Sequence, residues 1–324
     1  MTLESEIFNI KTAKDFNALA LEIFQNQAKN ISVYKKYLGH LKYNPEQTKD
    51  INTIPFLPIR FFKSYTIKKE NSKTEQLFKS SGTTLNTRSK HHVSSLNIYK
   101  KSFTECFNIH YGNIKDYTVL ALLPSYIEQG DSSLIYMVNE LIKTSGNQSQ
   151  FIPNDITKMS YIFNKLKNKK VLLIGVSYAL LEMAEQKDWD FSNWTIMETG
   201  GMKGKRKELT RGELHHILKS AFNVNTIHSE YGMTELLSQA YCQKDGYFST
   251  PPWMKVKIRE VNDPFSYCPE NKTGGINIID LANINSCSFI ATDDLGKKNE
   301  KGFKVLGRFD QSDVRGCNQL NTIL

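Results

Sequence analysis

Between residues 90 and 250, candidate helices alternate with short runs rich in Val, Ile and Leu. This alternation is expected of a mostly parallel sheet whose two faces are covered by helices. The apolar runs predict strands at about 117–123, 150–152, 170–176, 194–198 and 224–228. The intervening segments predict helices at about 91–110, 131–143, 156–167, 177–186 and 207–221. We therefore predict an α/β fold.

The N-terminal segment follows a different pattern. From residue 13 to residue 43, apolar residues recur at steps of three and four, as Phe16, Leu19 and Ile23 do. This spacing predicts one or two amphipathic helices. Residues 51–62 hold two prolines between short apolar runs, which predicts an extended, irregular segment.

Beyond Pro251 and Pro252 the pattern changes again. Short apolar runs separated by Gly, Asn, Asp and Pro predict a small antiparallel β subdomain, with strands at about 256–261, 275–279, 288–291 and 304–306. The chain is thus predicted to have four parts: a helical cap (1–75), an α/β core (76–250), the β subdomain (251–310) and a C-terminal tail (311–324).

Composition excludes several classes of protein. Apolar residues make up 40% of the 324 residues and charged residues 23%, which excludes collagen-like and mostly disordered chains. The excess of 42 basic over 33 acidic side chains favours anions in general and selects none of them. The longest apolar stretches, 119–124 and 171–176, fall far short of the ~20 residues that span a bilayer. Five cysteines without a CxxC pair argue against a zinc finger, and with no signal peptide they predict a cytoplasmic protein.

The clearest local signal is the turn Ser80-Ser81-Gly82-Thr83-Thr84. Arg88, Ser89 and Lys90 follow it, before a predicted helix. Hydroxyls, backbone amides, cations and a helix N-terminus are groups that bind phosphate. The turn is not a Walker A loop, because no GK[ST] stands in the required frame. An ordinary Ser/Thr-rich surface loop is an equally good interpretation of this turn alone.

Two further polar turns directly follow predicted strands. They are Glu198-Thr199-Gly200-Gly201-Met202-Lys203 and Ser229-Glu230-Tyr231-Gly232-Met233-Thr234-Glu235. Ligands of open α/β sheets bind outside the carboxyl ends of the strands, so these turns are predicted to line one cleft. A single glycine pair more often serves only as a tight turn.

The later β region holds two predicted turns, Thr292-Asp293-Asp294-Leu295-Gly296 and Leu306-Gly307-Arg308-Phe309-Asp310. Carboxylates accept hydrogen bonds from ribose hydroxyls, and arginine pairs with phosphate. Each turn alone also fits an ordinary connection.

Taken in order, SSGTT…RSK, GG, YGMTE, TDDL and GRFD resemble the motifs of the adenylate-forming (acyl-CoA synthetase-like, ANL) superfamily from about Phe78 to Asp310. FKSSGTT with RSKHH, LPSYIEQGDSSLIYM, the GG-x-K turn and the RGC near the C-terminus are similar to LuxE-type acyl-protein synthetases. Those proteins are the fatty-acid ligase component of the luminescence fatty-acid reductase. The resemblance implies an adenylate-forming N-terminal domain that uses ATP and Mg²⁺.

The resemblance also implies roles for individual residues. The β- and γ-phosphates of ATP would be held in the first turn, by Ser80, Ser81, Gly82, Thr83, Thr84 and Lys90. Tyr231 would stack on adenine near Gly200, Gly201 and Gly232. Thr234 would touch the α-phosphate, and Glu235 would bind Mg²⁺. Asp294 would bind the ribose hydroxyls, with Arg308 near the ribose and the α-phosphate.

The sequence departs from the superfamily at its end. It stops 14 residues after Asp310, where related synthetases continue into a C-terminal domain of ~100 residues. We expect that domain and its catalytic lysine to be largely absent. Lys203 or Lys205 is a candidate to supply positive charge at the α-phosphate, and an equally good candidate for a solvated surface lysine. The resemblance implies acylation of a cysteine near the C-terminus, and Cys317 is the one so placed, although a buried core residue is the ordinary role of a free cysteine.

These observations predict a cytoplasmic enzyme that activates a carboxylic acid, by resemblance a fatty acid, with Mg-ATP and transfers the acyl group to a protein thiol. The expected partners are the acid and an acyl-accepting reductase or acyl carrier protein; neither nucleic acid nor a membrane span is expected. One alternative is an acid–thiol ligase that loads coenzyme A or a carrier protein. Another is a non-catalytic protein that binds nucleotides or nucleic acid through its basic surplus.

Overall fold

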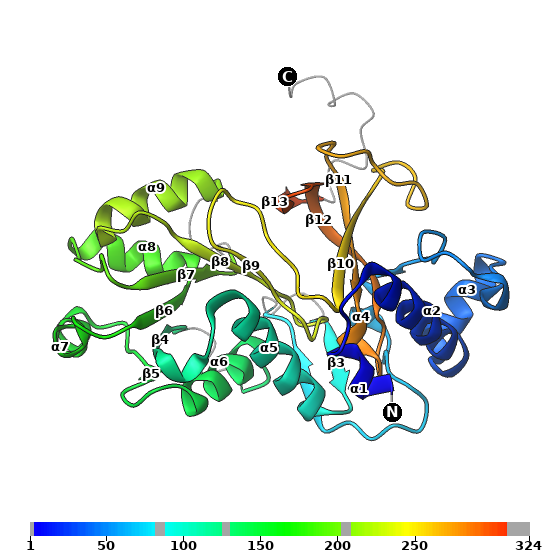
Figure 1. Cartoon of the computed structure of the whole chain (residues 1–324), viewed down its shortest axis with the longest axis horizontal. Coiled ribbons are helices and arrows are strands. Elements are labelled where there is room, and N and C mark those ends of the chain that lie inside the picture. The colour runs from blue at the N-terminus through cyan, green and yellow to red at the C-terminus, as the bar shows by residue number, and fades with distance from the viewer. Residues whose placement is uncertain (1–2, 82–87, 125–129, 202–208, 310–324) are drawn as a thin grey trace.

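The computed structural model describes residues 3–81, 88–124, 130–201 and 209–309. These residues form two sheets side by side, with a short hairpin where the sheets meet and a group of helices beyond the second sheet (Figure 1). Within these four ranges no helix is long and apolar enough to cross a membrane.

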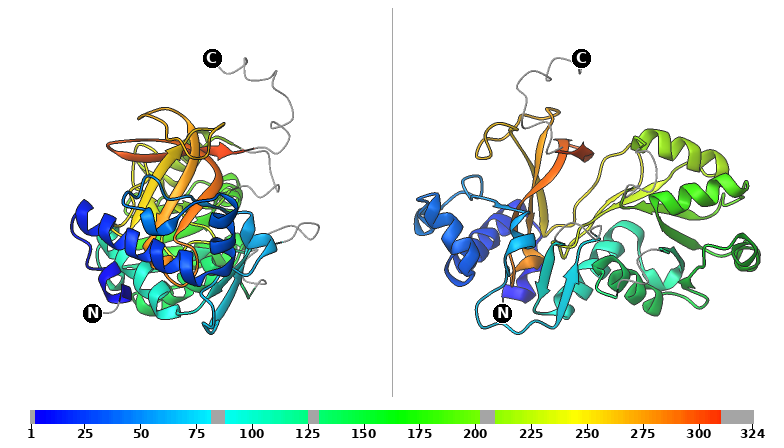
Figure 2. Two further views of the ribbon diagram at one scale, coloured as in Figure 1. Left: turned by 90° about the vertical axis from the view of Figure 1, so that its right-hand side faces the viewer. Right: turned by 180° about the vertical axis from the view of Figure 1, so that it is seen from behind.

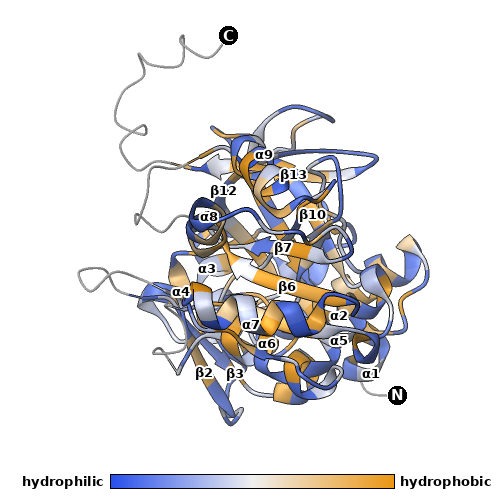
Figure 3. Cartoon of the chain, turned by 90° about the vertical axis from the view of Figure 1, so that its left-hand side faces the viewer, coloured by the Kyte–Doolittle hydropathy of each residue, from blue (hydrophilic) through white to orange (hydrophobic). Residues whose placement is uncertain are grey.

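The larger sheet has six strands in the order β5-β4-β6-β7-β8-β9, and the first five run parallel. All residues of the central strands β4 and β6 are buried, which requires helices on both faces. Figure 3 shows β6 as a hydrophobic strand in the middle of this layer. The prediction of an α/β fold is confirmed. The strands are β4 (Thr118–Leu122), β5 (Gln150–Phe151), β6 (Val171–Val176), β7 (Thr195–Thr199), β8 (His228–Tyr231) and β9 (Ala240–Cys242).

Helices cover the two faces of this sheet. The α8–α9 pair lies on one face and the α5–α6 pair on the other (Figure 1). Ser95, Ser132, Asp155 and Thr210 cap the N-termini of α5, α6, α7 and α9 with their side chains, which explains where these helices begin. The helices are α5 (Leu96–Tyr111), α6 (Ser133–Thr144), α7 (Ile156–Leu166), α8 (Ser177–Gln186) and α9 (Arg211–Phe222), with a short helix η2 (Ile114–Asp116).

The strand predicted at 224–228 lies too early in the sequence, because the apolar Val224 is part of the C-terminal cap of α9. Asn223 adopts a left-handed conformation (φ 51°), and the Val224 amide donates to the Lys219 carbonyl oxygen. These are features of a Schellman motif, which closes α9. The strand β8 therefore begins only at His228.

The second sheet has the order β1-β12-β11-β10, with β13 paired to β12. Its strands are antiparallel except for the short β1, which runs parallel to β12, so the predicted antiparallel region is confirmed. The strands are β1 (Leu57–Pro58), β10 (Met254–Arg259), β11 (Gly274–Asp280), β12 (Phe289–Asn299) and β13 (Gly302–Arg308). A short helix η3 (Leu281–Asn283) follows β11.

The predicted turn at 292–296 and the first three residues of the predicted turn at 306–310 lie in strands, and Asp310 lies outside the described residues. Residues 292–296 lie inside β12, where Thr292, Asp294 and Gly296 alternate toward the buried side. Pairing with β11 and β13 on both sides outweighs the turn-forming composition of this segment. Arg308 is the last residue of β13.

The N-terminal helices pack against the second sheet on the side away from the larger sheet (Figure 2). The Phe24 ring lies 5.7 Å from the Phe289 ring, and the buried Gln27 side chain donates to Asn283 O and Ser288 Oγ. The predicted amphipathic helices are confirmed. They are α2 (Ala13–Asn30) and α3 (Ser32–His40). The other short helices here are α1 (Leu3–Ile7), η1 (Pro45–Gln47) and α4 (Phe61–Ser64), and α4 begins inside the segment 51–62 that was predicted to be extended and irregular.

The hairpin of β2 (Gln76–Lys79) and β3 (Lys90–Val93) corrects a further prediction. The helix expected at 91–110 begins only at Leu96, after its N-cap Ser95, and the preceding residues pair with β2. β2 ends at Lys79 and β3 begins at Lys90, so the segment between them lies between two strands and does not open directly onto a helix. Successive side chains of a strand point to opposite faces, so His91 and His92 are separated by β3 itself.

One buried carboxylate joins the two sheets. Asp280 Oδ2 accepts hydrogen bonds from the Leu237 and Ser238 amides, at 2.8 and 3.0 Å, and its Oδ1 accepts from Ser238 Oγ and the Ala282 amide. Asp280 therefore ties the end of β11 to the segment that follows β8.

We expect Asp280→Asn to lower the free energy of unfolding by about 2–4 kcal/mol, because an amide NH₂ would face two buried donors. Urea denaturation of both proteins measures this loss. The exposed Asp263 provides the control, since Asp263→Asn should change the free energy by less than about 1 kcal/mol. A loss below 1 kcal/mol for Asp280→Asn would show that this anchor is dispensable.

Candidate functional site

The base of the β2–β3 hairpin is held together by polar contacts. The Ser80 hydroxyl accepts from the Ser89 amide at 2.9 Å, and Arg88 Nε donates to the Ser80 carbonyl oxygen. Arg88 also forms two bonds to the Asp131 carboxylate, at 2.9 and 3.3 Å, and Lys79 pairs with the same carboxylate at 3.1 Å. Burial raises the pKa of Asp131, but these two cations lower it further and hold it below its usual range. Arg88 is thus a structural cation at this point.

The predicted phosphate-binding residues lie only partly within the described residues. Ser81 is exposed after β2, and Lys90 is exposed as the first residue of β3. Gly82, Thr83 and Thr84 lie outside the described residues. The described flanks therefore offer one hydroxyl and one cation to solvent at the base of the turn.

The glycine turn after β7 is fixed by a buried carboxylate. Ser177 Oγ donates to Glu198 Oε2 and to the Gly200 carbonyl oxygen, each at 3.1 Å, and Arg211 pairs with Glu198 at 3.0 Å. Burial alone would raise the pKa of Glu198, but His215 and Arg211 hold it below its usual range. Gly200 has φ 68°, a conformation that favours glycine, and Gly201 follows it at the surface. Lys203 lies outside the described residues.

Tyr231, Asp294 and Arg308 meet at the junction of the two sheets. The Tyr231 hydroxyl donates to Asp294 Oδ2 at 2.7 Å, and Arg308 Nε donates to Asp294 Oδ1 at 3.1 Å. The Tyr231 ring packs against Phe248 and Phe303, which leaves 8% of the residue exposed. Asp294 is buried, whereas the Arg308 side chain is 79% exposed. Three residues predicted from separate motifs thus form one hydrogen-bonded group.

The segment after Tyr231 brings Glu235 against the hairpin. The Glu235 carboxylate is 5% exposed and lies close enough to the Ser89 side chain for Ser89 to lower its pKa. Burial raises the pKa of Glu235, while the Ser89 hydrogen bond and the charge of Arg308 oppose the rise. Gly232, at the start of this segment, lets the backbone pass close to the Glu230 side chain, because a Cβ at this position would lie 2.4 Å from Glu230 Oε1. The Thr234 carbonyl oxygen accepts from His91 Nδ1.

Comparison with known families identifies the chain. The model of a family described as acyl-protein synthetase, LuxE, matches residues 136–323, more than half of the sequence. The chain belongs to the LuxE acyl-protein synthetase family. No curated protein matches it by sequence.

Several solved structures are similar in fold to this LuxE-family chain. ATP-bound MatB from Rhodopseudomonas palustris is 15% identical, with a TM-score of 0.53 over 72% of this chain and 47% of that one. MenE, the O-succinylbenzoate coenzyme A synthetase from Bacillus subtilis in complex with ATP and magnesium, is 19% identical, with a TM-score of 0.52 over 73% and 50%. A 2-hydroxyisobutyryl-CoA ligase in complex with 2-HIB-AMP and CoA is 10% identical, with a TM-score of 0.63 over 93% and 72%. The chain spans about half the length of the first two, and these likenesses show the fold.

Residues of this LuxE-family chain to which the sequence analysis assigned no role also contribute to the site. Asp131 neutralises Arg88 and Lys79, Ser89 contacts Glu235, and Asn283 Nδ2 donates to the Glu235 carbonyl oxygen. Asp131 lies within the quoted motif LPSYIEQGDSSLIYM, which was a signal for it. Asn283 follows β11 and lies in no recognisable motif, so its contact with Glu235 could not be predicted from the sequence.

Glu230 is a further buried carboxylate beside the site. It accepts a hydrogen bond from Thr199, and burial raises the pKa of Glu230 to about 7, with a smaller contribution from Glu198. An unfolded glutamate titrates near 4.5, so the folded protein binds this proton more tightly. The proton's contribution to stability is complete below pH 4.5 and is lost as the pH rises through 7.

We therefore expect Glu230→Gln to become more stable than the wild type as the pH rises. The gain should approach about 3 kcal/mol above pH 7 and vanish near pH 4.5, because the amide carries no proton to lose. Urea denaturation at pH 4.5, 6 and 8 measures the difference. The exposed Glu22, changed to Gln, should show no such trend, and a constant difference for Glu230→Gln would contradict the assignment.

Proposed function

We propose that this chain activates a carboxylic acid with Mg-ATP, forming an acyl-adenylate and pyrophosphate, and passes the acyl group to a protein cysteine thiol. The observation that carries the proposal is the junction of the two sheets. There Glu235 meets Ser89 at the base of the hairpin, and Tyr231, Asp294 and Arg308 form one group. Membership of the LuxE family and the adenylate-forming fold support the same activity.

The residues present fit a Mg²⁺ ion held by one protein carboxylate. No group of three or more His, Cys, Asp or Glu suited to a metal occurs among the described residues, whereas Glu235 is a single buried carboxylate beside the hairpin. Mg²⁺ typically binds one or two carboxylates together with substrate phosphates and water. We propose Glu235 as its protein ligand. The bound ion would neutralise phosphate charge during the transfer.

The chain's own residues would position the nucleotide. Asp294 would accept hydrogen bonds from the ribose hydroxyls, and the exposed Arg308 would pair with the α-phosphate. Thr234 would contact the α-phosphate. Tyr231 would lie beside adenine, near the glycines at 200, 201 and 232. The β- and γ-phosphates would be held by the segment from Ser80 to Lys90, through Ser80, Ser81, Gly82, Thr83, Thr84 and Lys90. A carboxylate oxygen of the acid would then attack the α-phosphorus, and pyrophosphate would leave with the electrons of the broken P–O bond. Lys203 would supply further positive charge at this step.

The acceptor we propose is Cys317, outside the described residues. In the second step its thiolate would attack the acyl carbon, and AMP would leave as the thioester forms. The other four cysteines are poor candidates. Cys106, Cys242 and Cys287 are buried, burial raises their pKa, and burial with the nearby Glu260 also raises the pKa of Cys268. A reductase or acyl carrier protein would then accept the acyl group from the thioester.

The experiment that tests activation is pyrophosphate release from the pure protein with Mg-ATP and a panel of fatty acids of increasing length plus benzoate. Release that depends on one class of acid supports the proposal and names the substrate class. If pyrophosphate is released, the protein carries no acyl adduct and acyl-CoA forms when coenzyme A is added, the acid–thiol ligase is favoured. ATP binding with no release for any acid would overturn the activation step.

A further inference from the structure

Two buried side chains outside the nucleotide motifs hold the backbone of the Thr234–Glu235 segment. His91 Nδ1 lies 2.8 Å from the Thr234 carbonyl oxygen, and Asn283 Nδ2 donates to the Glu235 carbonyl oxygen at 2.7 Å. Both side chains belong to fully buried residues, and they come from different elements, β3 and η3. The two successive carbonyl groups are therefore held from two separate parts of the fold.

These contacts supply what regular structure does not. Residues 232–239 lie between β8 and β9 in neither helix nor strand. Thr234 and Glu235 are the middle residues of a turn in which the Leu236 amide donates to the Met233 carbonyl oxygen, and their own carbonyl groups belong to no ladder. Buried backbone carbonyls need a donor, and here each donor is a side chain. His91 and Asn283, together with this turn, thus fix the orientation of the peptide that carries the Glu235 side chain.

The proton on His91 is fixed by its partner. A carbonyl oxygen only accepts, so Nδ1 must carry the hydrogen. Burial lowers the pKa of His91 to about 4, which keeps the ring neutral at pH 7. Nε2 is then an acceptor, and neither it nor Asn283 Oδ1 has a hydrogen-bond partner among the described residues.

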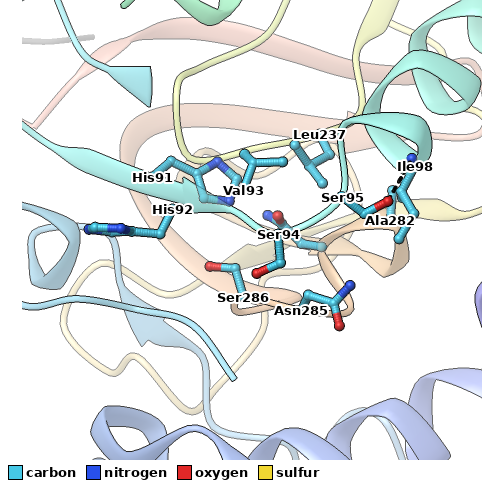
Figure 4. A pocket seen from close by; sticks show the side chains of 11 residues that line it. His91, His92, Val93, Ser94, Ser95, Ile98, Leu237, Ala282, Asn285 and Ser286 are labelled. Carbon is cyan, nitrogen blue, oxygen red and sulfur yellow. Dashed lines mark hydrogen bonds between the residues drawn. The ribbon is translucent and has the colours of Figure 1, made fainter. Parts of the chain in front are cut away.

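Both residues line a cavity of about 10 Å³, shared with Leu237 and Ala282 (Figure 4). A cavity of this size is at the lower limit of the space that one water molecule needs. His92, the next residue, also lines this cavity, but its ring extends away from the His91 ring and approaches Thr74 Oγ1 at 3.5 Å. The two histidines therefore differ in what they touch, although they are adjacent.

We propose that His91 and Asn283 are positioning residues, which hold the Thr234–Glu235 backbone so that the Glu235 carboxylate faces Mg-ATP. The inference rests on the proposed function, since it takes Glu235 as the carboxylate that serves the nucleotide. Groups that orient a metal ligand from behind typically change metal affinity or activity by about 10–100-fold when they are removed.

A pair of substitutions at one position separates positioning from packing. In His91→Asn, the amide nitrogen lies close to the place of Nδ1 and keeps the donor to Thr234. In His91→Gln, the longer side chain carries its nitrogen near the place of Nε2 and loses that donor. His92→Gln is the matched control on the same strand. Asn283→Leu removes the second donor at similar volume and serves if a His91 variant fails to fold.

The measurements are pyrophosphate release as a function of Mg²⁺ at saturating ATP, calorimetric binding of Mg-ATP, and the melting temperature. We expect His91→Gln and Asn283→Leu to need about 10–100-fold more Mg²⁺ for half-maximal release. His91→Asn and His92→Gln should stay within about threefold of the wild type. Equal Mg²⁺ dependence of His91→Gln and the wild type, or an equal loss in His91→Asn and His91→Gln, would overturn the inference.

Failure of the proposed function gives a different result. If the wild type binds Mg-ATP but releases no pyrophosphate with any acid, activation is excluded and the positioning role is decided by binding alone. Weaker Mg²⁺-dependent binding in His91→Gln, with recovery in His91→Asn, would still support it. The same affinity in all variants would overturn it.

Discussion

Glu235→Gln should lower acid-dependent pyrophosphate release by about 100-fold or more while the protein stays folded. A metal-bound carboxylate contributes several kcal/mol of charge stabilisation at the reacting phosphate, and each 1.4 kcal/mol corresponds to about tenfold in rate. Burial already raises the pKa of Glu235, so an uncharged side chain of the same shape should leave the melting temperature unchanged or higher. Steady-state kinetics and thermal melting of both proteins measure the two effects.

The control for this prediction is Glu260→Gln. Glu260 pairs with Lys272 on the surface, with both side chains partly exposed, and should be neutral in both assays. Release by Glu235→Gln within threefold of the wild type would remove Glu235 from the site. A parallel fall in melting temperature would instead assign the residue a role in folding.

Cys317→Ser should abolish the ATP-dependent acyl adduct on the protein. The wild type, incubated with Mg-ATP and an active acid, should gain the mass of one acid molecule less one water molecule, and hydroxylamine should remove the adduct, as a thioester requires. The serine variant should keep its first turnover of pyrophosphate and show no adduct. Intact-mass measurement reads both proteins directly.

Cys268→Ser is the matched control, because Cys268 is the one thiol among the described cysteines that is not fully buried. It should acylate like the wild type. An adduct that persists in Cys317→Ser and disappears in Cys268→Ser would move the acceptor to the β subdomain. Loss of the adduct in both variants would point to a shared effect on folding.

The two central strands of the larger sheet, β4 and β6, were predictable because they are buried along their whole length. Uninterrupted apolar runs such as Val171–Val176 fix both the type and the place of a strand. Helix α8 was predicted at its observed bounds because it begins directly after the buried strand β6. The family resemblance assigned Tyr231, Asp294 and Arg308 to one nucleotide site, and the structure brings these three side chains together.

Other features depended on partners far away in the sequence. His91 and His92 are poor markers of a strand, and β3 exists because it pairs with β2 and because His91 finds the Thr234 carbonyl group. Asp294 sits in a turn-like sequence, yet pairing on both sides makes it part of β12. Local propensity is weak in such places, and tertiary contacts decide the conformation.

The most direct test of the central claim follows a single oxygen atom. The acid with the greatest pyrophosphate release is prepared with ¹⁸O in both carboxyl oxygens and incubated with the wild type and Mg-ATP. If a carboxylate oxygen attacks the α-phosphorus, one labelled atom leaves with AMP when the acyl group is transferred, and AMP gains 2 Da. Unlabelled AMP, or label in inorganic phosphate together with ADP, would contradict an acyl-adenylate intermediate.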